Sequence, residues 1–355
     1  MSRSILLLAL ALLVAPVRAD EPTKAEKPTP VAAVVETTLA TDGDKIRQFA
    51  FDGSADSYFA SAKPPTEKDS FTLKFDKPVT VKSVKVVTGK PKGGGELAGG
   101  VLSGSADGKA FDQVAKFADG SISAKPEKKF TALRIEFPAD SKEPLLLREI
   151  TLETDPPVAA FKNPVEITTD ATDAPELKEW FENVAKVCEK QYPMLNEELK
   201  SEGYTPPTRI TMTLKKDYNG VAYAQGSKIV GSVAYFEKHK DDVGAFVHET
   251  AHCVQQYRGR GNPGWLVEGV ADYVRFFKYE AKKPAKLQPE KAKYDGSYRT
   301  TAAFLDYLVE TQDKEIVKKL NETMRKGKYA DTIWKDLTGK TVEELGRDWQ
   351  KSLAK

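Results

Sequence analysis

The stretch HETAHCVQQYRGRGNPGWLVEGVADYV, residues 248–274, places one glutamate between two histidines and a second glutamate sixteen residues after the last histidine. His248 and His252 are two of the three histidines in the 355 residues. On a helix, side chains at positions i and i+4 lie on one face, so both imidazoles can reach a single metal ion. Glu249 stands beside the first histidine, where it can reach a water on that ion without being a ligand. The stretch therefore predicts a helix that carries a metal site.

The H-E-x-x-H spacing is typical of zinc hydrolases, whose catalytic Zn2+ has three protein ligands and one position open for water. The predicted third ligand is Glu268, in the apolar helical segment GWLVEGVADYV. A carboxylate among apolar residues is costly unless it is paired or bound to a metal. The glycine-rich turn at 258–264 lets this second helix fold back on the first. The remaining histidine, His239, lies in a polar segment and is a weaker alternative ligand.

Asp272 lies four residues after Glu268, on the same face of the second helix. A metal-bound histidine usually donates its other N–H to a carboxylate or carbonyl, which fixes the orientation of the ring. We predict that Asp272 accepts this hydrogen bond from His248 rather than from His252. The alternative is an acid on the helix surface.

The N-terminus predicts secretion. Arg3, the apolar run ILLLALALLV and the small-residue site at 17–19 form the pattern of a cleavable signal peptide over residues 1–19. The protein is therefore expected to be secreted or periplasmic, and no later segment is apolar enough to cross a membrane. Cys188 and Cys253 are the two cysteines. In an oxidising compartment they form either one disulfide or two buried thiols, and the sequence leaves this open.

The charge of the mature chain is close to zero. Removal of the signal peptide takes away Arg3 and Arg18, which leaves 52 basic residues against 52 acidic ones. A neutral chain gives no reason to expect nucleic acid or an anionic membrane as a partner.

Three segments of different composition follow the expected signal peptide. Residues 20–34 are rich in proline, lysine and glutamate and predict a linker. Residues 35–156 contain short alternating runs, such as SFTLKF and TALRIEF, that predict an antiparallel β-sandwich. Residues 163–355 predict an α+β domain.

Several elements of this α+β domain have local signals. A long helix is expected after a cap at Asp173, a strand over 210–214, and further strands around a turn at Gly226. Thr341 and Glu344 have the spacing of a capping box at the last helix. The segment KIVGSVAYF, residues 228–236, is expected at the sheet edge, where a peptide adds as an extended strand.

The first half resembles discoidin-like domains. The motifs FDGSADSYFAS (51–61), LSGSADGKAFDQVAKF (102–117), FTALRIEF (130–137) and LLLREITLE (145–153) occur in the order seen in those domains. The resemblance implies a galactose-binding-like fold and a ligand such as a glycan, a lipid or a cell-surface protein. The alternative is a structural or spacing module that binds no ligand. Asp52 and Asp56 are a further candidate site for calcium.

The second half is similar to the plant basic secretory protein family and its bacterial relatives. The segments GVAYAQGSKIVGSVAYF, FVHETAHCVQQYRGRGNPGWLVEGVADYVR, YDGSYRTTAAFLDYL and LTGKTVEEL follow that family's pattern in order. The resemblance implies a zincin-like metallopeptidase fold, zinc and a secreted proteolytic role. Two departures are that the mature chain is not basic and that Cys253 replaces a residue usually apolar in the relatives.

The residues predict a mechanism of peptide hydrolysis. Glu249 is expected to act as the general base toward a zinc-activated water. Tyr298 is the candidate donor to the oxyanion, with Tyr294 and Tyr235 as rivals and a packing role as the alternative. The competing function is a glycan- or surface-binding protein whose zincin half is an inactive scaffold. A scaffold has no physical need for Glu249, which favours the peptidase. The natural substrate and the oligomeric state stay open.

Overall fold

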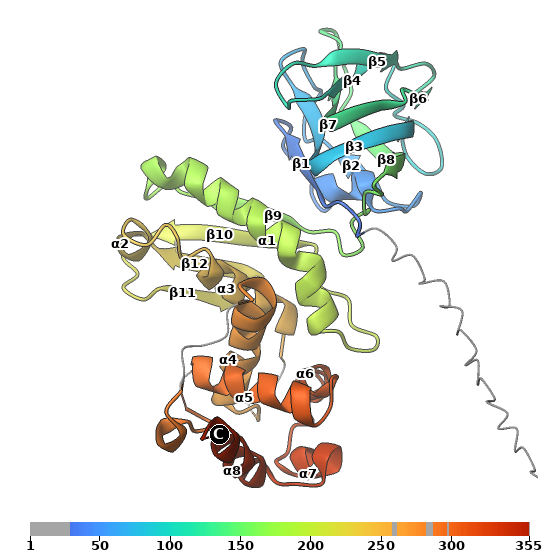
Figure 1. The fold of residues 1–355 in the computed structure, drawn as a ribbon. Coiled ribbons are helices and arrows are strands. Elements are labelled where there is room, and N and C mark those ends of the chain that lie inside the picture. The colour runs from blue at the N-terminus through green and yellow to red at the C-terminus, as the bar shows by residue number, and fades with distance from the viewer. Residues whose placement is uncertain (1–28, 258–260, 282–286, 297, 355) are drawn as a thin grey trace, which may run out of the picture.

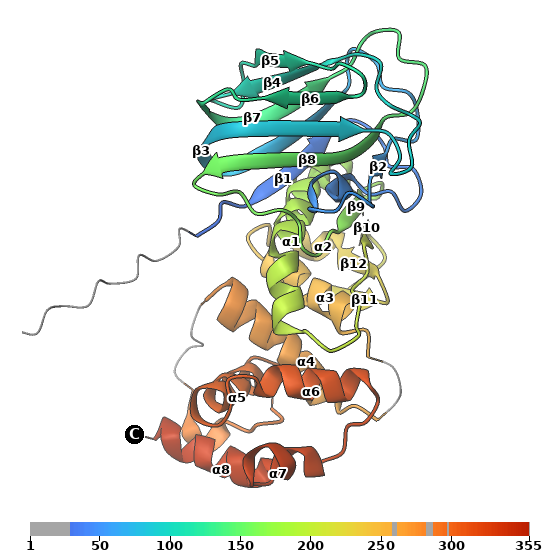
Figure 2. The ribbon, with the colours of Figure 1, turned by 90° about the vertical axis from the view of Figure 1, so that its right-hand side faces the viewer.

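The computed structural model of the chain describes residues 29–257, 261–281, 287–296 and 298–354, and contains two separate hydrophobic cores. The first is built from residues between 31 and 161, the second from residues between 165 and 349, and Figures 1 and 2 show the two domains one above the other. The expected signal peptide and residues 20–28 of the expected linker lie outside the described residues. In the described part, no helix is long and apolar enough to span a membrane.

The first domain is an antiparallel β domain, organised around one long strand. β3 pairs with β1, β6, β7 and β8. Along the main path of the sheet the strands follow the order β2-β8-β3-β7-β4-β5. A short 3-10 turn, η1 (Arg47–Phe51), packs on β8. The strands are β1 (Ala33–Thr37), β2 (Phe59–Ala60), β3 (Ser70–Thr88), β4 (Val101–Ser105), β5 (Asp112–Lys116), β6 (Ser121–Ala124), β7 (Lys128–Glu136) and β8 (Leu146–Asp155).

The alternating runs of the sequence do form strands, with two differences. The runs at 71–75 and 79–86 belong to one continuous strand, β3, with a register shift between Lys74 and Val79. β1 begins at Ala33, inside the range expected to be linker, because its buried side chains join the core.

The second domain has a four-stranded mixed sheet, in the order β11-β12-β10-β9, with helices packed against it. β9, β10 and β12 are parallel, whereas β11 is antiparallel to β12. The strands are β9 (Glu166–Asp170), β10 (Arg209–Lys215), β11 (Ala222–Gln225) and β12 (Lys228–Ser232). The α-helices are α1 (Lys178–Glu198), α2 (Val233–Phe236), α3 (Gly244–Gln255), α4 (Gly264–Tyr273), α5 (Tyr298–Thr311), α6 (Ile316–Arg325), α7 (Thr332–Thr338) and α8 (Val342–Leu353). Shorter turns are η2 (Pro175–Leu177), the π-helical η3 (Val274–Tyr279) and η4 (Pro289–Lys291).

Local signals in this domain have mixed outcomes. The capping box at Thr341 and Glu344 is confirmed at the start of α8. Asp173, however, does not cap the long helix, because its carboxylate accepts from the backbone N–H of Lys216 instead. The segment 228–236 is also not the sheet edge: its first part is the inner strand β12, and Ser232 then caps the short helix α2.

Arg47 of the first domain joins the two domains through buried carboxylates of the second. Its guanidinium pairs with Glu166 on β9, at 3.5 Å, and with Glu189 on α1. Thr41 donates a further 2.6 Å hydrogen bond to Glu166. The two glutamate side chains are only 5% and 2% exposed, so their charges depend on the arginine more than on solvent. Burial raises the pKa of Glu189 to about 7, although the charge of Arg47 partly opposes the rise.

Replacement of Arg47 by alanine is therefore expected to lower the free energy of unfolding by about 3–5 kcal/mol, because it leaves two buried carboxylates without their cation. Urea denaturation measures this loss. The matched control is Lys190→Ala, which breaks a partly exposed interdomain pair with Asp76 and is expected to cost only about 0–1 kcal/mol. Equal losses for the two variants would contradict the role assigned to Arg47.

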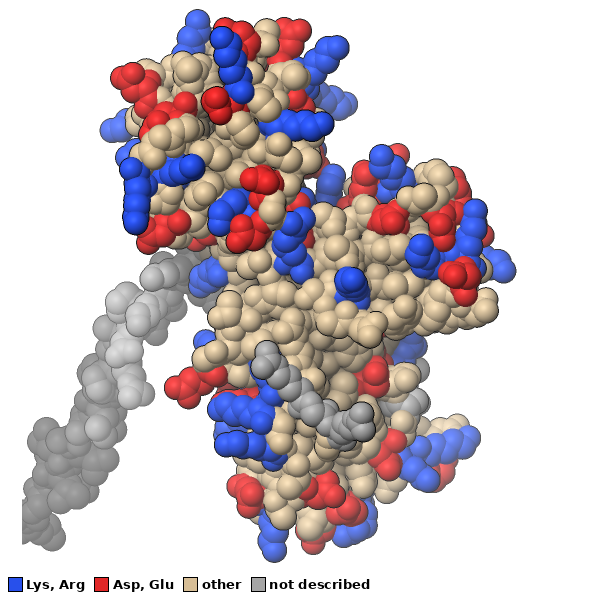
Figure 3. All heavy atoms as spheres, turned by 180° about the vertical axis from the view of Figure 1, so that it is seen from behind, with Lys and Arg blue, Asp and Glu red and all other residues tan. Residues whose placement is uncertain are grey.

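Both domains carry basic as well as acidic side chains on their surfaces. On the face shown in Figure 3, basic and acidic side chains are interspersed over both domains. This distribution agrees with the formal net charge of +2 over the 355 residues.

Candidate metal centre

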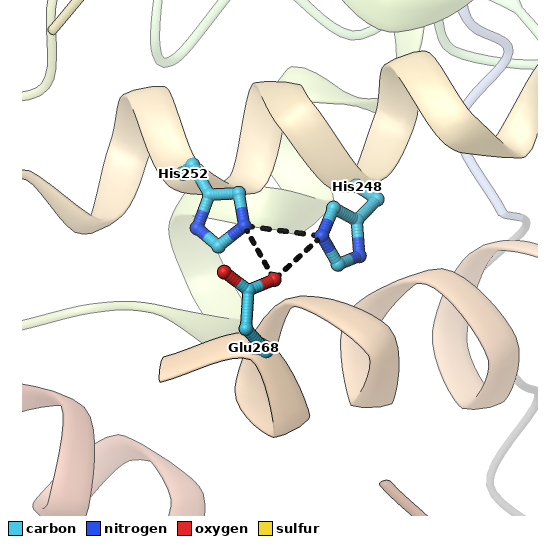
Figure 4. A group of neighbouring side chains, drawn as sticks. All are labelled: His248, His252 and Glu268. Carbon is cyan, nitrogen blue, oxygen red and sulfur yellow. Dashed lines mark hydrogen bonds and ion pairs between the residues drawn. The ribbon is translucent and has the colours of Figure 1, made fainter. Parts of the chain in front are cut away.

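Two helices position the three candidate ligands. α3 carries His248 and His252 on one face, and α4 carries Glu268 opposite them (Figure 4). α3 ends at Gln255, and the left-handed backbone of Gln256 (φ 40°) then turns the chain away. α4 starts after Pro263, whose extended backbone ends the turn. The other residues of α3 are buried, and its apolar side chains pack in the core, which fixes the direction of both imidazoles.

The three ligand atoms form a small triangle. His248 Nε2 and His252 Nε2 are 3.0 Å apart, and each lies 3.2 Å from Glu268 Oε2. Three ligands on a tetrahedral zinc at its usual bond lengths lie roughly 3.3 Å from one another. Two imidazoles and a carboxylate are also a donor set that zinc accepts. Among the described residues, these three make the one group of three or more side chains able to hold a metal ion.

The Nδ1 atom of each imidazole lies within hydrogen-bonding distance of a side-chain oxygen. Asp272 Oδ1 lies 2.6 Å from His248 Nδ1, and Gln255 Oε1 lies 2.7 Å from His252 Nδ1. Gln255 also donates to the carbonyl of Val267, and so ties α3 to α4. The sequence pointed to Asp272 but not to Gln255; the one available signal was a hydrogen-bonding side chain three residues after His252.

The carboxylates give the site a negative field. Burial lowers the pKa of His248, but hydrogen bonds with Asp272 and Glu268 outweigh this and raise it to about 9. Burial raises the pKa of Glu268, yet hydrogen bonds with the two imidazoles hold it below its usual range. The same arrangement of acids that favours a protonated imidazole also favours a divalent cation.

Glu249 lies beside the trio without joining it. Its side chain belongs to a residue only 8% exposed, yet it lines the cleft that contains the histidines. Burial raises the pKa of the carboxyl, opposed by the charges of His248 and His252. A hydrogen bond with the backbone of Ala224 connects it to the edge strand β11. Glu249 is therefore placed between the candidate metal ligands and the edge of the sheet.

A cleft of about 1130 Å³ opens over these residues. β11 and the segment before it line one part of the cleft, and the start of α5 lines another. Tyr298, on the first turn of α5, is 57% exposed, and its ring centroid is 6.4 Å from that of His248. α5 approaches α4 closely because Gly269 has no side chain: a Cβ there would lie 2.1 Å from Thr301.

The other tyrosines and the third histidine are placed differently. Tyr235 lines the cleft, but its hydroxyl donates to Asp242 at 2.8 Å. Tyr294 packs against Trp265 and Phe304 and does not line the cleft. His239 lies against the ring of Tyr235, with centroids 4.5 Å apart, and is not among the residues that could share a metal.

Neither cysteine takes part in the site. Cys188 and Cys253 are both free and buried. Burial raises the pKa of each thiol to about 12, so neither is a reactive thiolate near neutral pH.

The region proposed for calcium contains a different pair of acids. Asp52 faces Glu149 of β8 rather than Asp56, which is exposed. Burial and the charge of Asp52 raise the pKa of Glu149 to about 8, and its Oε2 is buried without a hydrogen-bond partner.

Comparisons with known proteins find different matches for the two halves of the chain. The family model described as "Peptidase of plants and bacteria" matches residues 153–349. No curated protein matches the chain. A CBM32 domain from a family 31 glycoside hydrolase of Clostridium perfringens is 21% identical, with a TM-score of 0.30; the match covers 34% of this chain and 92% of that one. The family 32 CBM from C. perfringens NanJ, in complex with galactose, is 11% identical over 34% and 92% of the two chains, with a TM-score of 0.29. These structural matches cover the N-terminal part of the chain.

Proposed function

This chain belongs to the family of peptidases of plants and bacteria, and we propose that it is a zinc-dependent peptidase that hydrolyses peptide bonds in a peptide or protein substrate. The observation that carries the proposal is the triangle formed by His248, His252 and Glu268, whose spacing and chemistry suit zinc. The oxygens of Asp272 and Gln255 behind the two imidazoles support it, because they orient both rings toward one point.

Glu249 is proposed as the general base. When bound, zinc supplies Lewis acidity toward the water and the scissile carbonyl. The Glu249 carboxylate accepts the proton of the attacking water and passes it to the leaving amide nitrogen. A raised pKa suits this exchange, since the carboxyl must hold the proton between the two steps. The exposed Tyr298, beside His248, is proposed to donate to the developing oxyanion.

The edge strand β11 is proposed to align the substrate. The carbonyl of Val221 accepts from Ser232 of the inner strand, so the alternate backbone groups of Ala222 and Ala224 face away from β12. Glu249 hydrogen-bonds the backbone of Ala224 on this outward side. An extended peptide that pairs with the outward N–H of Ala222 and the outward carbonyl of Ala224 would therefore pass beside the general base.

Metal removal tests the proposed function. Full-length protein is expected to contain about one zinc per chain and to cleave casein or a mixed peptide library. A chelator such as 1,10-phenanthroline should abolish cleavage, and added zinc should restore it. Cleavage that persists in metal-free protein would overturn the zinc mechanism. Absence of cleavage by zinc-loaded protein would instead favour an inactive scaffold.

The first domain is proposed to be a recognition module for a glycan or cell-surface ligand, and the protein to act outside the cytoplasm. The proposal is supported by the discoidin-like motifs of residues 51–61 and 102–117 and by the signal-peptide pattern of residues 1–19. Glycan-array binding by the purified full chain tests the first part. The N-terminal sequence of protein recovered from the culture medium or periplasm tests the second.

A further inference from the structure

Large apolar side chains that remain exposed gather at one place on the described part of the molecule. Val221, Tyr223 and Tyr298 are the exposed large hydrophobics there, with 39%, 42% and 57% of their surface accessible. All three line the cleft above the candidate metal ligands. Single exposed apolar residues are ordinary, but their concentration in one cleft indicates a surface built to be covered.

The alternation of β11 explains why two of these side chains face the cleft. Ala222 and Ala224 pack against the hydrophobic core of the second domain. Because side chains alternate along a strand, Val221 and Tyr223 point to the other face. The small residues thus anchor the strand, and the large ones form an apolar wall beside Glu249, which bonds to the same strand.

Tyr223 is held in place before any ligand binds. Its ring meets that of Tyr218 edge to face, with centroids 5.0 Å apart and planes at 68°. The Tyr218 hydroxyl donates to the carbonyl of Ala222 at 3.3 Å. Gly220 makes room for this ring, since a Cβ there would lie 2.1 Å from the Tyr218 hydroxyl. A pre-ordered aromatic pair loses little conformational entropy on binding, so it contributes more of its contact energy to affinity.

We propose that the cleft selects peptides with a large apolar or aromatic side chain next to the scissile bond, received by the wall of Val221 and Tyr223. The inference rests on the proposed peptidase function and defines its substrate class. A peptide is favoured over a sugar as occupant because the wall belongs to an edge strand. Main-chain pairing along such a strand directs alternate substrate side chains to the same face as Tyr223. Tyr298 of α5 contributes apolar surface from another part of the cleft.

The test compares matched peptides that differ only in the residues flanking the cleaved bond: phenylalanine, leucine, alanine or glutamate. Burial of a large apolar side chain is worth about 1.5–3 kcal/mol. Zinc-loaded full-length protein is therefore expected to cleave the phenylalanine and leucine peptides with a kcat/KM about 10–100-fold above that of the alanine peptide. The glutamate peptide should be the poorest substrate.

Three variants assign the preference to the wall. Tyr223→Ala should lower the ratio of kcat/KM between phenylalanine and alanine peptides by about tenfold, whereas Tyr223→Phe should keep that ratio. Gly220→Ala should lower it as well, by displacing Tyr218. Tyr307→Ala, which removes a partly exposed tyrosine of α5 that does not line the cleft, is the control and should leave the ratio unchanged.

The outcomes separate this inference from the proposed function. Chelator-sensitive cleavage without preference for apolar residues overturns the inference and leaves the peptidase standing. A preference that survives Tyr223→Ala, in protein with wild-type zinc content and melting temperature, also overturns it. If zinc-loaded protein cleaves none of the peptides, the proposed peptidase function itself is refuted. If oligosaccharides bind in the cleft, if the phenylalanine peptide competes with them, and if no peptide is hydrolysed, the cleft is a sugar-binding site instead.

Discussion

Glu249→Gln is expected to keep the fold and the bound zinc and to lower kcat by about 10²–10⁴-fold, the usual contribution of a general base. Glutamine has nearly the same shape, and its amide oxygen can still accept the hydrogen bond from the backbone of Ala224. It has no basic carboxylate to take a proton from water. Because Glu249 is not one of the three grouped ligand side chains, the metal should stay. Zinc per chain, by atomic spectroscopy, and peptide hydrolysis are measured on the same sample.

The control for Glu249→Gln is Glu237→Gln, which removes one carboxylate from an exposed position at the end of α2. This control should retain wild-type kcat and zinc. Normal turnover by the Glu249 variant would show that another group moves the proton, and the mechanism proposed here would be wrong. Loss of zinc from that variant would instead mean that Glu249 contributes to the ligand set.

The candidate site was predictable because most of its information is local. His248 and His252 share one helix, and their i,i+4 spacing fixes them on one face whatever the rest of the chain does. Glu268 and Asp272 share the next helix at the same spacing, so one turn of the chain sufficed to bring the two pairs together. Gln255 was missed because many polar side chains can orient an imidazole, and a glutamine on a helix carries no distinctive pattern.

The parts that were not predictable depend on pairing between distant segments. β11 and β12 both have strand signals, but only the pairing of β12 with β10 decides that β11 is the edge. The contact between Arg47 and Glu189 joins residues that are 142 positions apart, and no local sequence pattern predicts it. Asp173 precedes a helix as a cap does, yet the nearby end of β10 offers the Lys216 N–H in competition. At such positions a tertiary partner overrides the local preference.

Glu268→Ala is expected to remove zinc and activity together. Without this carboxylate, two neutral imidazoles from one helix remain, and a catalytic zinc site needs three protein ligands. The variant also removes the one ligand that comes from α4, so the ion would no longer bridge the two helices. Metal affinity should therefore fall by more than the roughly 10–100-fold that loss of an orienting group costs. The measurements are zinc per chain after dialysis against a weak chelator and hydrolysis of the best peptide substrate.

Asp272→Asn provides the graded comparison for Glu268→Ala. Asp272 contacts His248 but is not in the ligand triangle, so its loss should weaken zinc binding by about 10–100-fold without abolishing it. The expected order of zinc retention is wild type and Glu249→Gln first, then Asp272→Asn, then Glu268→Ala. Full zinc in Glu268→Ala would mean that another residue is the third ligand. Greater loss from Asp272→Asn than from Glu268→Ala would transfer that role to Asp272, because an outer carboxylate cannot matter more than the ligand it supports.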